Sequence, residues 1–109
     1  MPAGVSRSTE AVLRVLLDAP KDGPGLYGAE ISRLASVGNG SLYPALDGLE
    51  DAGWIEGIWE EGDPAKMSRP RRRYYRLTGL GAVEAERVIA DALRRLAPKG
   101  WQPAPGWSQ

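Results

Sequence analysis

The chain has 109 residues, of which 42% are hydrophobic and 26% are charged, and its formal net charge is zero. This length predicts one domain. The sequence has no histidine and no cysteine, which excludes His-dependent triads, cysteine nucleophiles, disulfides and Cys/His zinc sites. We see no signal peptide and no apolar run of membrane-spanning length. We therefore expect a cytoplasmic protein with no membrane association, no metal and no other cofactor.

Charge is segregated along the chain despite the zero net charge. No basic residue stands between Arg33 and Lys66, and the next ten residues contain no acidic one. The basic residues of that second stretch are Lys66, Arg69, Arg71, Arg72, Arg73 and Arg76. Arginine suits bidentate contact with phosphate, so this stretch predicts nucleic-acid binding. The alternative is a solvated surface of mixed charge.

The first half of the chain predicts helices separated by short loops. Helical spacing of apolar residues predicts a first helix from about Ser6 or Ser8 to Ala19, with Ser8 as candidate N-cap and Pro20 after its end. A loop rich in glycine and proline follows, and a second helix is expected over about residues 27–36.

The third helix is the most informative element. Proline is tolerated only in the first turn of a helix, so Pro44 favours Ser41 as the N-cap rather than a start at Asn39. Gly53 is expected to end the helix as a left-handed C-cap. One apolar stripe, formed by Leu42, Leu46 and Leu49, faces the core.

Two stretches with strand-like alternation, residues 54–60 and 71–77, flank a basic loop that contains glycine and prolines. They predict a β-hairpin that serves as a wing. Trp54 and Trp59 are assigned to packing of its first strand. Of Tyr74 and Tyr75, one is expected in the core and the other at the surface.

A last helix is expected from the N-cap Thr78 to about Leu96. Its first half packs within the protomer, whereas its second half favours a homodimer interface, because isologous dimers are the commonest oligomers. The candidate dimer residues are Ala85, Val88, Ile89, Ala92, Leu93 and Leu96. The tail after residue 97 contains Trp101 and Trp107 and is expected to be irregular.

This order of elements is that of a winged helix-turn-helix, a mainly α (α+β) fold with a two-stranded wing. We divide the chain into a DNA-binding domain at 1–77, a dimerisation helix at 78–97 and a tail at 98–109. In this fold the start of the third helix enters the major groove and the wing meets the flanking backbone. The candidate DNA contacts are Asn39, Ser41, Leu42 and Tyr43 from the helix and Lys66, Arg69, Arg71, Arg72 and Arg73 from the wing. The acidic residues Asp47, Glu50 and Asp51 must then avoid phosphate.

Several motifs resemble those of the PadR-like transcriptional regulators. They are Tyr-Gly-Ala-Glu-Ile at 27–31, Gly-Ser-Leu-Tyr-Pro-Ala-Leu at 40–46, Leu-Glu-x-x-Gly at 49–53, Arg-Pro at 69–70, Tyr-Tyr-x-Leu-Thr at 74–78 and Gly81. The resemblance implies a dimeric winged-helix regulator, usually a repressor, of the compact subgroup with one C-terminal helix. It further implies operator contacts from Ser41, Tyr43, Lys66, Arg69, Arg71 and Arg72. Because apolar or aromatic compounds release DNA from some members, Trp101 and Trp107 are candidate effector contacts.

The sequence thus predicts a homodimeric repressor that binds double-stranded DNA at a palindromic operator, with modest direct readout of bases and with release by a small effector. The alternative is a winged-helix protein-interaction module with only non-specific DNA affinity, whose acidic central segment meets a basic partner. An enzyme is not expected, because carboxylate pairs such as Glu60 and Glu61 sit in solvent and nothing assembles a catalytic site.

Overall fold

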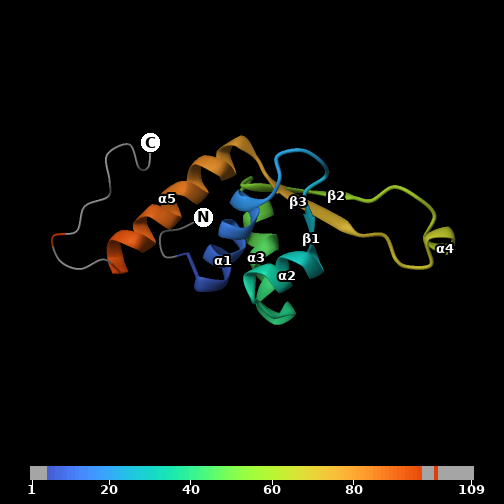
Figure 1. Cartoon of the computed structure of the whole chain (residues 1–109), viewed down its shortest axis with the longest axis horizontal. Helices are drawn as coiled ribbons and strands as arrows, with labels where there is room; N and C mark the ends of the chain where they lie inside the picture. The colour runs from blue at the N-terminus through green and yellow to red at the C-terminus, as the bar shows by residue number, and fades with distance from the viewer. Residues whose placement is uncertain (1–4, 97–99, 101–109) are drawn as a thin grey trace.

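The described part of the chain, residues 5–96 and Gly100, folds into helices and short antiparallel strands in this computed structural model (Figure 1). The elements are α1 (Arg7–Asp18), β1 (Leu26–Tyr27), α2 (Gly28–Ala35), α3 (Asn39–Asp51), β2 (Ile55–Trp59), α4 (Pro64–Met67), β3 (Arg73–Leu77) and α5 (Gly79–Leu96). This is the winged helix-turn-helix expected from the sequence. No helix of the described residues is long and apolar enough to cross a membrane.

The wing is part of a sheet with strand order β1-β3-β2. Strand β3 lies at the centre, so that Tyr74 pairs with Tyr27 on one side and with Ile58 on the other. The sequence did not predict β1, because two residues are too few to show alternation. Gly25 makes the pairing possible: its φ is 104°, and a Cβ at this position would lie 2.2 Å from the carbonyl oxygen of Tyr75.

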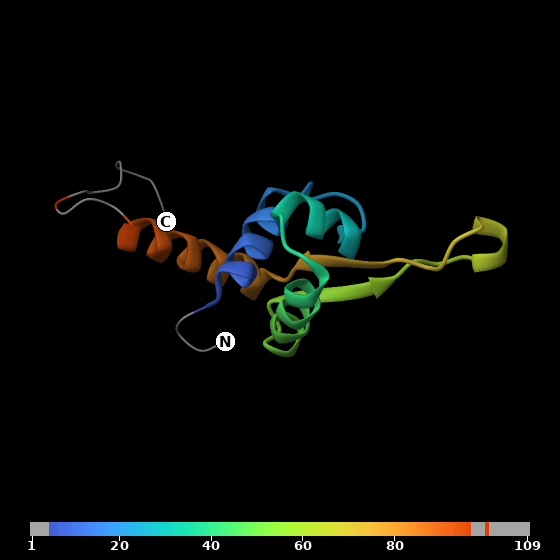
Figure 2. The same ribbon diagram turned by 90° about the horizontal axis from the view of Figure 1, so that it is seen from below.

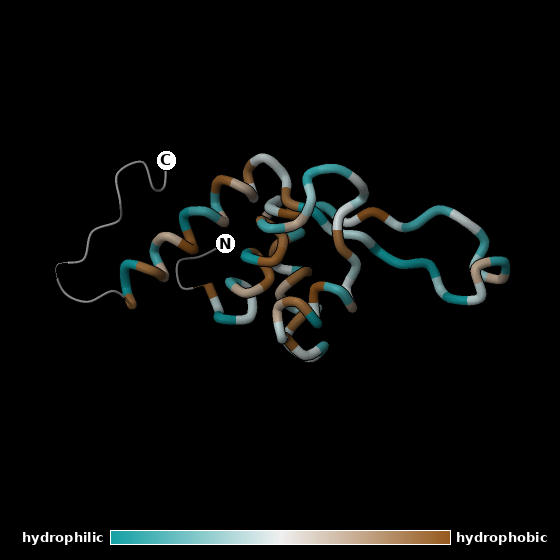
Figure 3. Tube along the Cα trace, in the orientation of Figure 1, coloured by the Kyte–Doolittle hydropathy of each residue, from teal (hydrophilic) through white to brown (hydrophobic). Residues whose placement is uncertain are grey.

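The core lies where α1, α2, α3 and the start of α5 meet the sheet. Its fully buried side chains include Leu13, Ile31 and Leu46, and Tyr75 contributes from β3. Figure 3 shows hydrophobic residues concentrated in the packed helices and hydrophilic residues along most of the hairpin. The body of the molecule is therefore held by helix packing, and the outer hairpin is held by its own strand pairing and polar contacts.

The hairpin and α5 leave this body in opposite directions (Figure 2). Thr78 caps α5 as expected, since its Oγ1 accepts a hydrogen bond of 3.0 Å from the backbone N–H of Gly81. Helix α5 packs on α1, its buried residues run from Gly81 to Ala92, and its C-terminal end extends past the other helices.

One predicted helix start, that of α3, and one predicted N-cap, that of α1, are wrong. Helix α3 begins at Asn39 with Gly38 as its N-cap, not at Ser41, so Pro44 stands inside the helix. The bond that Pro44 cannot donate would go to the carbonyl of Gly40, an exposed residue whose carbonyl water can satisfy. Helix α1 is capped by Ser6 rather than Ser8, because Ser6 Oγ accepts a 3.1 Å bond from the N–H of Thr9.

The loop between the wing strands contains a helical turn that the sequence did not predict. Asp63 Oδ1 accepts a 3.0 Å hydrogen bond from the N–H of Ala65, and Pro64 occupies the first turn of α4. The basic loop therefore has local structure at its tip.

Candidate nucleic-acid interface

The start of α3 presents polar side chains to solvent. Asn39, Ser41 and Tyr43 are exposed there, as a recognition helix requires. Leu42 is a correction: its side chain is 0% exposed and belongs to the core cluster, so it is not available to DNA. The apolar stripe that predicted the helix already included Leu42, and packing in the core is the role that Leu42 has.

Tyr43 is 45% exposed and leans over the start of α2. Its hydroxyl lies where a Cβ at Gly28 would be only 2.7 Å away. Because Gly28 has no side chain, the Tyr43 ring can lie against the start of α2, between the two helices of the helix-turn-helix.

A groove of about 740 Å³ runs between the helix-turn-helix and the wing. Its lining includes Tyr43 and Asp47 from α3, Ala29 from α2, and Arg71 and Arg72 from the wing. Exposed α3 side chains and wing cations thus converge on one face. Asp47 also faces this groove, so it does not point away from the wing.

Two of the expected wing contacts are already held by carboxylates. Arg69 donates to both carboxylate oxygens of Glu60 at 2.7 and 2.9 Å. These bonds lower the pKa of Glu60 from 4.5 to about 2 and raise the pKa of Arg69. Glu60 also accepts a 3.2 Å bond from the N–H of Arg72, so it closes the base of the outer loop.

Arg73 is held in the same way by Glu50 of α3, with 2.6 Å between Nη2 and Oε2. The hydrogen bond to Glu50 raises the pKa of Arg73, although desolvation opposes this shift. On the strand pair itself, Arg76 donates to Glu56 at 2.7 Å. The run of basic residues in the sequence therefore overstates the positive charge that this face offers.

The remaining wing cations have no carboxylate within salt-bridge distance among residues 5–96. Lys66 is exposed on α4. Arg71 is exposed, and its Nε donates to the carbonyl of Gly62 at 2.8 Å. The guanidinium of Arg72 lies 4.0 Å from the ring centroid of Tyr27, a cation–π contact that orients it. These three are the cations best placed to meet phosphate.

The expected dimer residues on α5 fall into two groups. Ala85 is fully buried in the protomer's own core and Ala92 is 3% exposed, which corrects their assignment to the dimer interface, because neither side chain is open to a partner. Val88 packs partly on that core, Ile89 and Leu93 are half-buried, and Leu96 is 83% exposed. The exposed apolar residues Leu80 and Val83 were missed, because they lie opposite the core-facing stripe.

The tryptophans and tyrosines divide between core and surface. Trp54 is buried, as expected of a packing residue, whereas Trp59 is exposed and lies beside the guanidinium of Arg73 at 5.4 Å. Tyr75 is buried, as predicted for one of the two tyrosines, whereas Tyr74 is half-buried rather than at the surface. The candidate effector contacts Trp101 and Trp107 lie outside the described residues.

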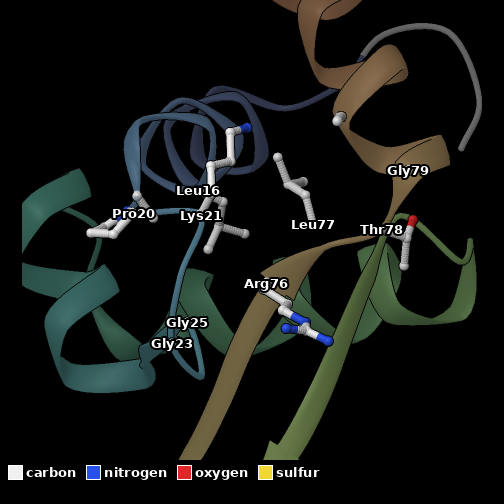
Figure 4. Close-up of a pocket in the computed structure, with 11 residues that line it drawn as sticks. Leu16, Pro20, Lys21, Gly23, Gly25, Arg76, Leu77, Thr78 and Gly79 are labelled. Atoms are coloured by element: carbon white, nitrogen blue, oxygen red, sulfur yellow. The ribbon is translucent and has the colours of Figure 1, made fainter.

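A second, smaller cavity of about 210 Å³ lies at the junction of α1, β3 and α5. Leu16 and Leu77 point into it, and Lys21 and Thr78 also line it (Figure 4). It shares no lining residue with the groove between α3 and the wing. The cavity is therefore separate from the candidate interface.

Comparison with known proteins agrees with this architecture. A family model described as the transcriptional regulator PadR-like family matches residues 12–87. A search of curated proteins gave no match.

Several solved structures have the same fold. A Ralstonia eutropha protein, provisionally described as DNA-binding, has a TM-score of 0.62 and 24% identity, covering 79% of this chain and 99% of its own. A PadR-like transcription factor from Bacteroides fragilis has a TM-score of 0.61 and 23% identity, covering 82% and 88%. A MarR-family regulator from Silicibacter pomeroyi has a TM-score of 0.60 and 27% identity, covering 92% of this chain but 62% of its own.

Proposed function

The chain belongs to the PadR-like family of transcriptional regulators, a family of non-enzymes, and we propose that it represses transcription by binding a palindromic operator as a homodimer. One observation carries this proposal. Tyr43 of α3 and the wing cations Arg71 and Arg72 line the same groove. A duplex whose major groove receives the start of α3 therefore brings its flanking phosphates to the wing.

Base contacts in this proposal come from the first turn of α3 and from Tyr43. Asn39 and Ser41 offer hydrogen-bonding groups, and Tyr43 offers a hydroxyl and an apolar ring. Asp47 lies one turn further and faces the groove, so phosphate must stay away from it. Few side chains then read bases directly, and DNA shape and half-site spacing supply the rest of the discrimination.

Wing contacts go to the sugar-phosphate backbone. Lys66, Arg71 and Arg72 attract phosphate without reading sequence. Arg69 and Arg73 were also predicted as contacts, and their carboxylate partners Glu60 and Glu50 make them weaker candidates. We therefore expect each protomer to make only a modest number of phosphate contacts.

The second half of α5 supplies the dimer surface. It projects past the other helices (Figure 2), and Leu96 at its end is open to solvent. Ile89, Leu93 and Leu96 lie along one helical stripe, because Leu93 follows Ile89 by four residues and Leu96 follows Leu93 by three. Pairing two such stripes about a two-fold axis buries them and places two α3 helices on one duplex.

The dimer is tested by changing apolar residues at the two ends of α5. Leu93→Gln with Leu96→Gln should shift sedimentation equilibrium toward monomer and weaken operator binding. Leu80→Gln with Val83→Gln is the matched control, since it also removes two partly exposed apolar side chains from α5. Dissociation by the control pair alone would place the dimer surface on the other face of the helix.

Repression is tested with a reporter under the promoter of this protein's own gene. Expression of the chain should lower reporter output, and Lys66→Ala with Arg71→Ala should restore it. Increased output with the wild-type chain would show activation instead of repression.

Release by a small aromatic or apolar effector is the part of the proposal that comes from the family resemblance and from Trp101 and Trp107. Intrinsic tryptophan fluorescence, titrated with planar aromatic compounds, tests it. Quenching that accompanies release of a labelled duplex supports an effector, and constant fluorescence across a broad panel removes this part of the proposal.

The alternative, a protein-interaction module with only non-specific DNA affinity, is favoured by the ion pairs of the wing. Arg69, Arg73 and Arg76 each have a carboxylate partner, so the wing presents less positive charge than its sequence suggests. The two functions differ in salt dependence. A repressor keeps its preference for operator DNA at about 150 mM salt, whereas non-specific binding is lost there.

A further inference from the structure

Arg73 is partly buried between a carboxylate of α3 and two aromatic side chains of the wing. Its side chain is 28% exposed, and its partner Glu50 is 31% exposed. The guanidinium lies beside the rings of Trp59, at 5.4 Å, and Tyr75, at 5.8 Å. A Cβ at Gly57 would be 2.6 Å from Nε of Arg73. The missing side chain of Gly57 therefore makes room for Arg73 to cross β2.

The ion pair that Arg73 forms also differs in what it connects. Glu50 is in the last turn of α3, and Arg73 is the first residue of β3. The pairs Arg69–Glu60 and Arg76–Glu56 stay within the hairpin. Among the ion pairs of residues 5–96, Arg73–Glu50 is the one that links the wing to the recognition helix.

We propose that Arg73 and Glu50 form a positioning pair that fixes the wing against α3, so that Arg73 increases operator affinity without contacting DNA. The inference rests on the proposed function, because it concerns how the two DNA-contacting elements are held. If the pair is broken, the wing must be ordered at the moment of binding, and that ordering lowers affinity. Arginine suits this role because a planar guanidinium can lie against Trp59 and Tyr75 while it donates to a carboxylate.

The proposal reverses the simple electrostatic expectation for Glu50. A carboxylate at a DNA-binding face repels phosphate, so its neutralisation by Glu50→Gln would be expected to strengthen binding. A positioning role predicts weaker binding instead. It also predicts that loss of Arg73 leaves the salt dependence unchanged, whereas loss of a phosphate contact lowers the slope of log K against log salt by about 1.

The first experiment measures binding of a labelled duplex from the DNA upstream of this protein's own gene, across a range of salt. Glu50→Gln and Arg73→Gln should each weaken binding about fivefold to tenfold at every salt concentration, with an unchanged slope. The charge swap Glu50→Arg with Arg73→Glu should recover part of this loss. Glu56→Gln is the matched control, since it breaks an ion pair within the sheet, and it should bind as the wild type does. Tighter binding by Glu50→Gln, or a lower slope for Arg73→Gln, would overturn the proposal.

The second experiment needs no DNA and therefore separates this inference from the proposed function. The chain has no cysteine, so Arg33→Cys in α2 and Ala65→Cys in α4 provide the only two sites for spin labels. The distance distribution between them should be narrow in the wild-type background and with Glu56→Gln, and broad with Glu50→Gln. An unchanged distribution with Glu50→Gln would contradict the proposal, even if operator binding is confirmed. Absence of any operator preference in the wild type would instead reject the proposed function.

Discussion

The hydroxyl of Tyr43 and the backbone of Gly28 are in such close contact that an added Cβ would lie 2.7 Å from the hydroxyl oxygen. Gly28 is the first residue of α2, and Tyr43 is an exposed residue of α3. The two helices of the helix-turn-helix therefore meet at a point where a glycine sets the orientation of a candidate base-contacting ring.

Gly28→Ala should displace this ring and weaken operator binding without unfolding the protein. The neighbour that must move is the end of a half-exposed side chain, so the displacement is inexpensive for the fold. Binding of the labelled duplex by anisotropy, together with the melting temperature, checks this. Undiminished affinity with a shifted Tyr43 ring would remove Tyr43 from the interface.

Gly48→Ala serves as the matched control on α3. No atom lies within 4 Å of a Cβ at this position, and the residue is in the helix interior. Alanine should raise the free energy of unfolding by about 0.5–1 kcal/mol and leave DNA affinity unchanged. Urea unfolding measures the first quantity, and a destabilised variant would mean that another part of the protein packs against α3 at Gly48.

Gly81→Ala should be strongly destabilising. A Cβ there would lie 1.7 Å from the carbonyl oxygen of Trp54, which is backbone and cannot turn aside. The start of α5 would have to move off the sheet, at a cost of about 3 kcal/mol in the free energy of unfolding. Chemical denaturation is the measurement, and wild-type stability in this variant would show that α5 does not sit so close to Trp54.

Glu60 should titrate far below an ordinary glutamate. Its hydrogen bonds from Arg69 lower its pKa from 4.5 to about 2. Because the folded pKa is the lower one, the stabilisation by this pair is fully present above pH 4.5 and is lost as the pH falls through about 2. The carboxyl ¹³C shift of Glu60 reports this titration by NMR, and Glu60→Gln should remove the corresponding pH dependence. A midpoint near 4.5 would show that the pair does not form in solution.

The unpaired wing cations should determine the salt dependence of DNA binding. Lys66→Ala and Arg71→Ala should each reduce the slope of log K against log salt by about 1, because each removes one phosphate contact. Arg76→Ala is the control, since Arg76 is paired with Glu56 on the strands. Equal slopes for all three variants would mean that the wing tip does not touch the backbone.

Most of the fold was predictable because it depends on local signals. The leucine stripe of α3, the cap at Thr78 and the alternation of the wing strands each report nearby residues. Strand β1 was not predictable, since it depends on the close approach of Gly25 to Tyr75, a residue distant in the sequence. The predicted start of α3 was wrong because the restriction of proline to the first helical turn does not consider solvent. The carbonyl of Gly40, which Pro44 leaves without a partner, belongs to an exposed residue and can bind water.

The candidate interface was less predictable than the fold. The sequence correctly placed exposed polar residues at the start of α3, and its apolar stripe already placed Leu42 in the core, so naming Leu42 as a DNA contact contradicted that stripe. It also counted Arg69 and Arg73 as available, although carboxylates hold both. The partners Glu50 and Glu60 stand 23 and 9 residues before the arginines they hold, a separation that only folding resolves.

The most direct test of the central claim is the anisotropy of a labelled duplex from the DNA upstream of this protein's own gene, compared with a scrambled duplex across salt. A dimeric operator-binding regulator predicts a preference for the native duplex that persists near about 150 mM salt. Equal binding to both duplexes that disappears at this salt concentration would contradict it and would leave the protein-interaction module as the better account.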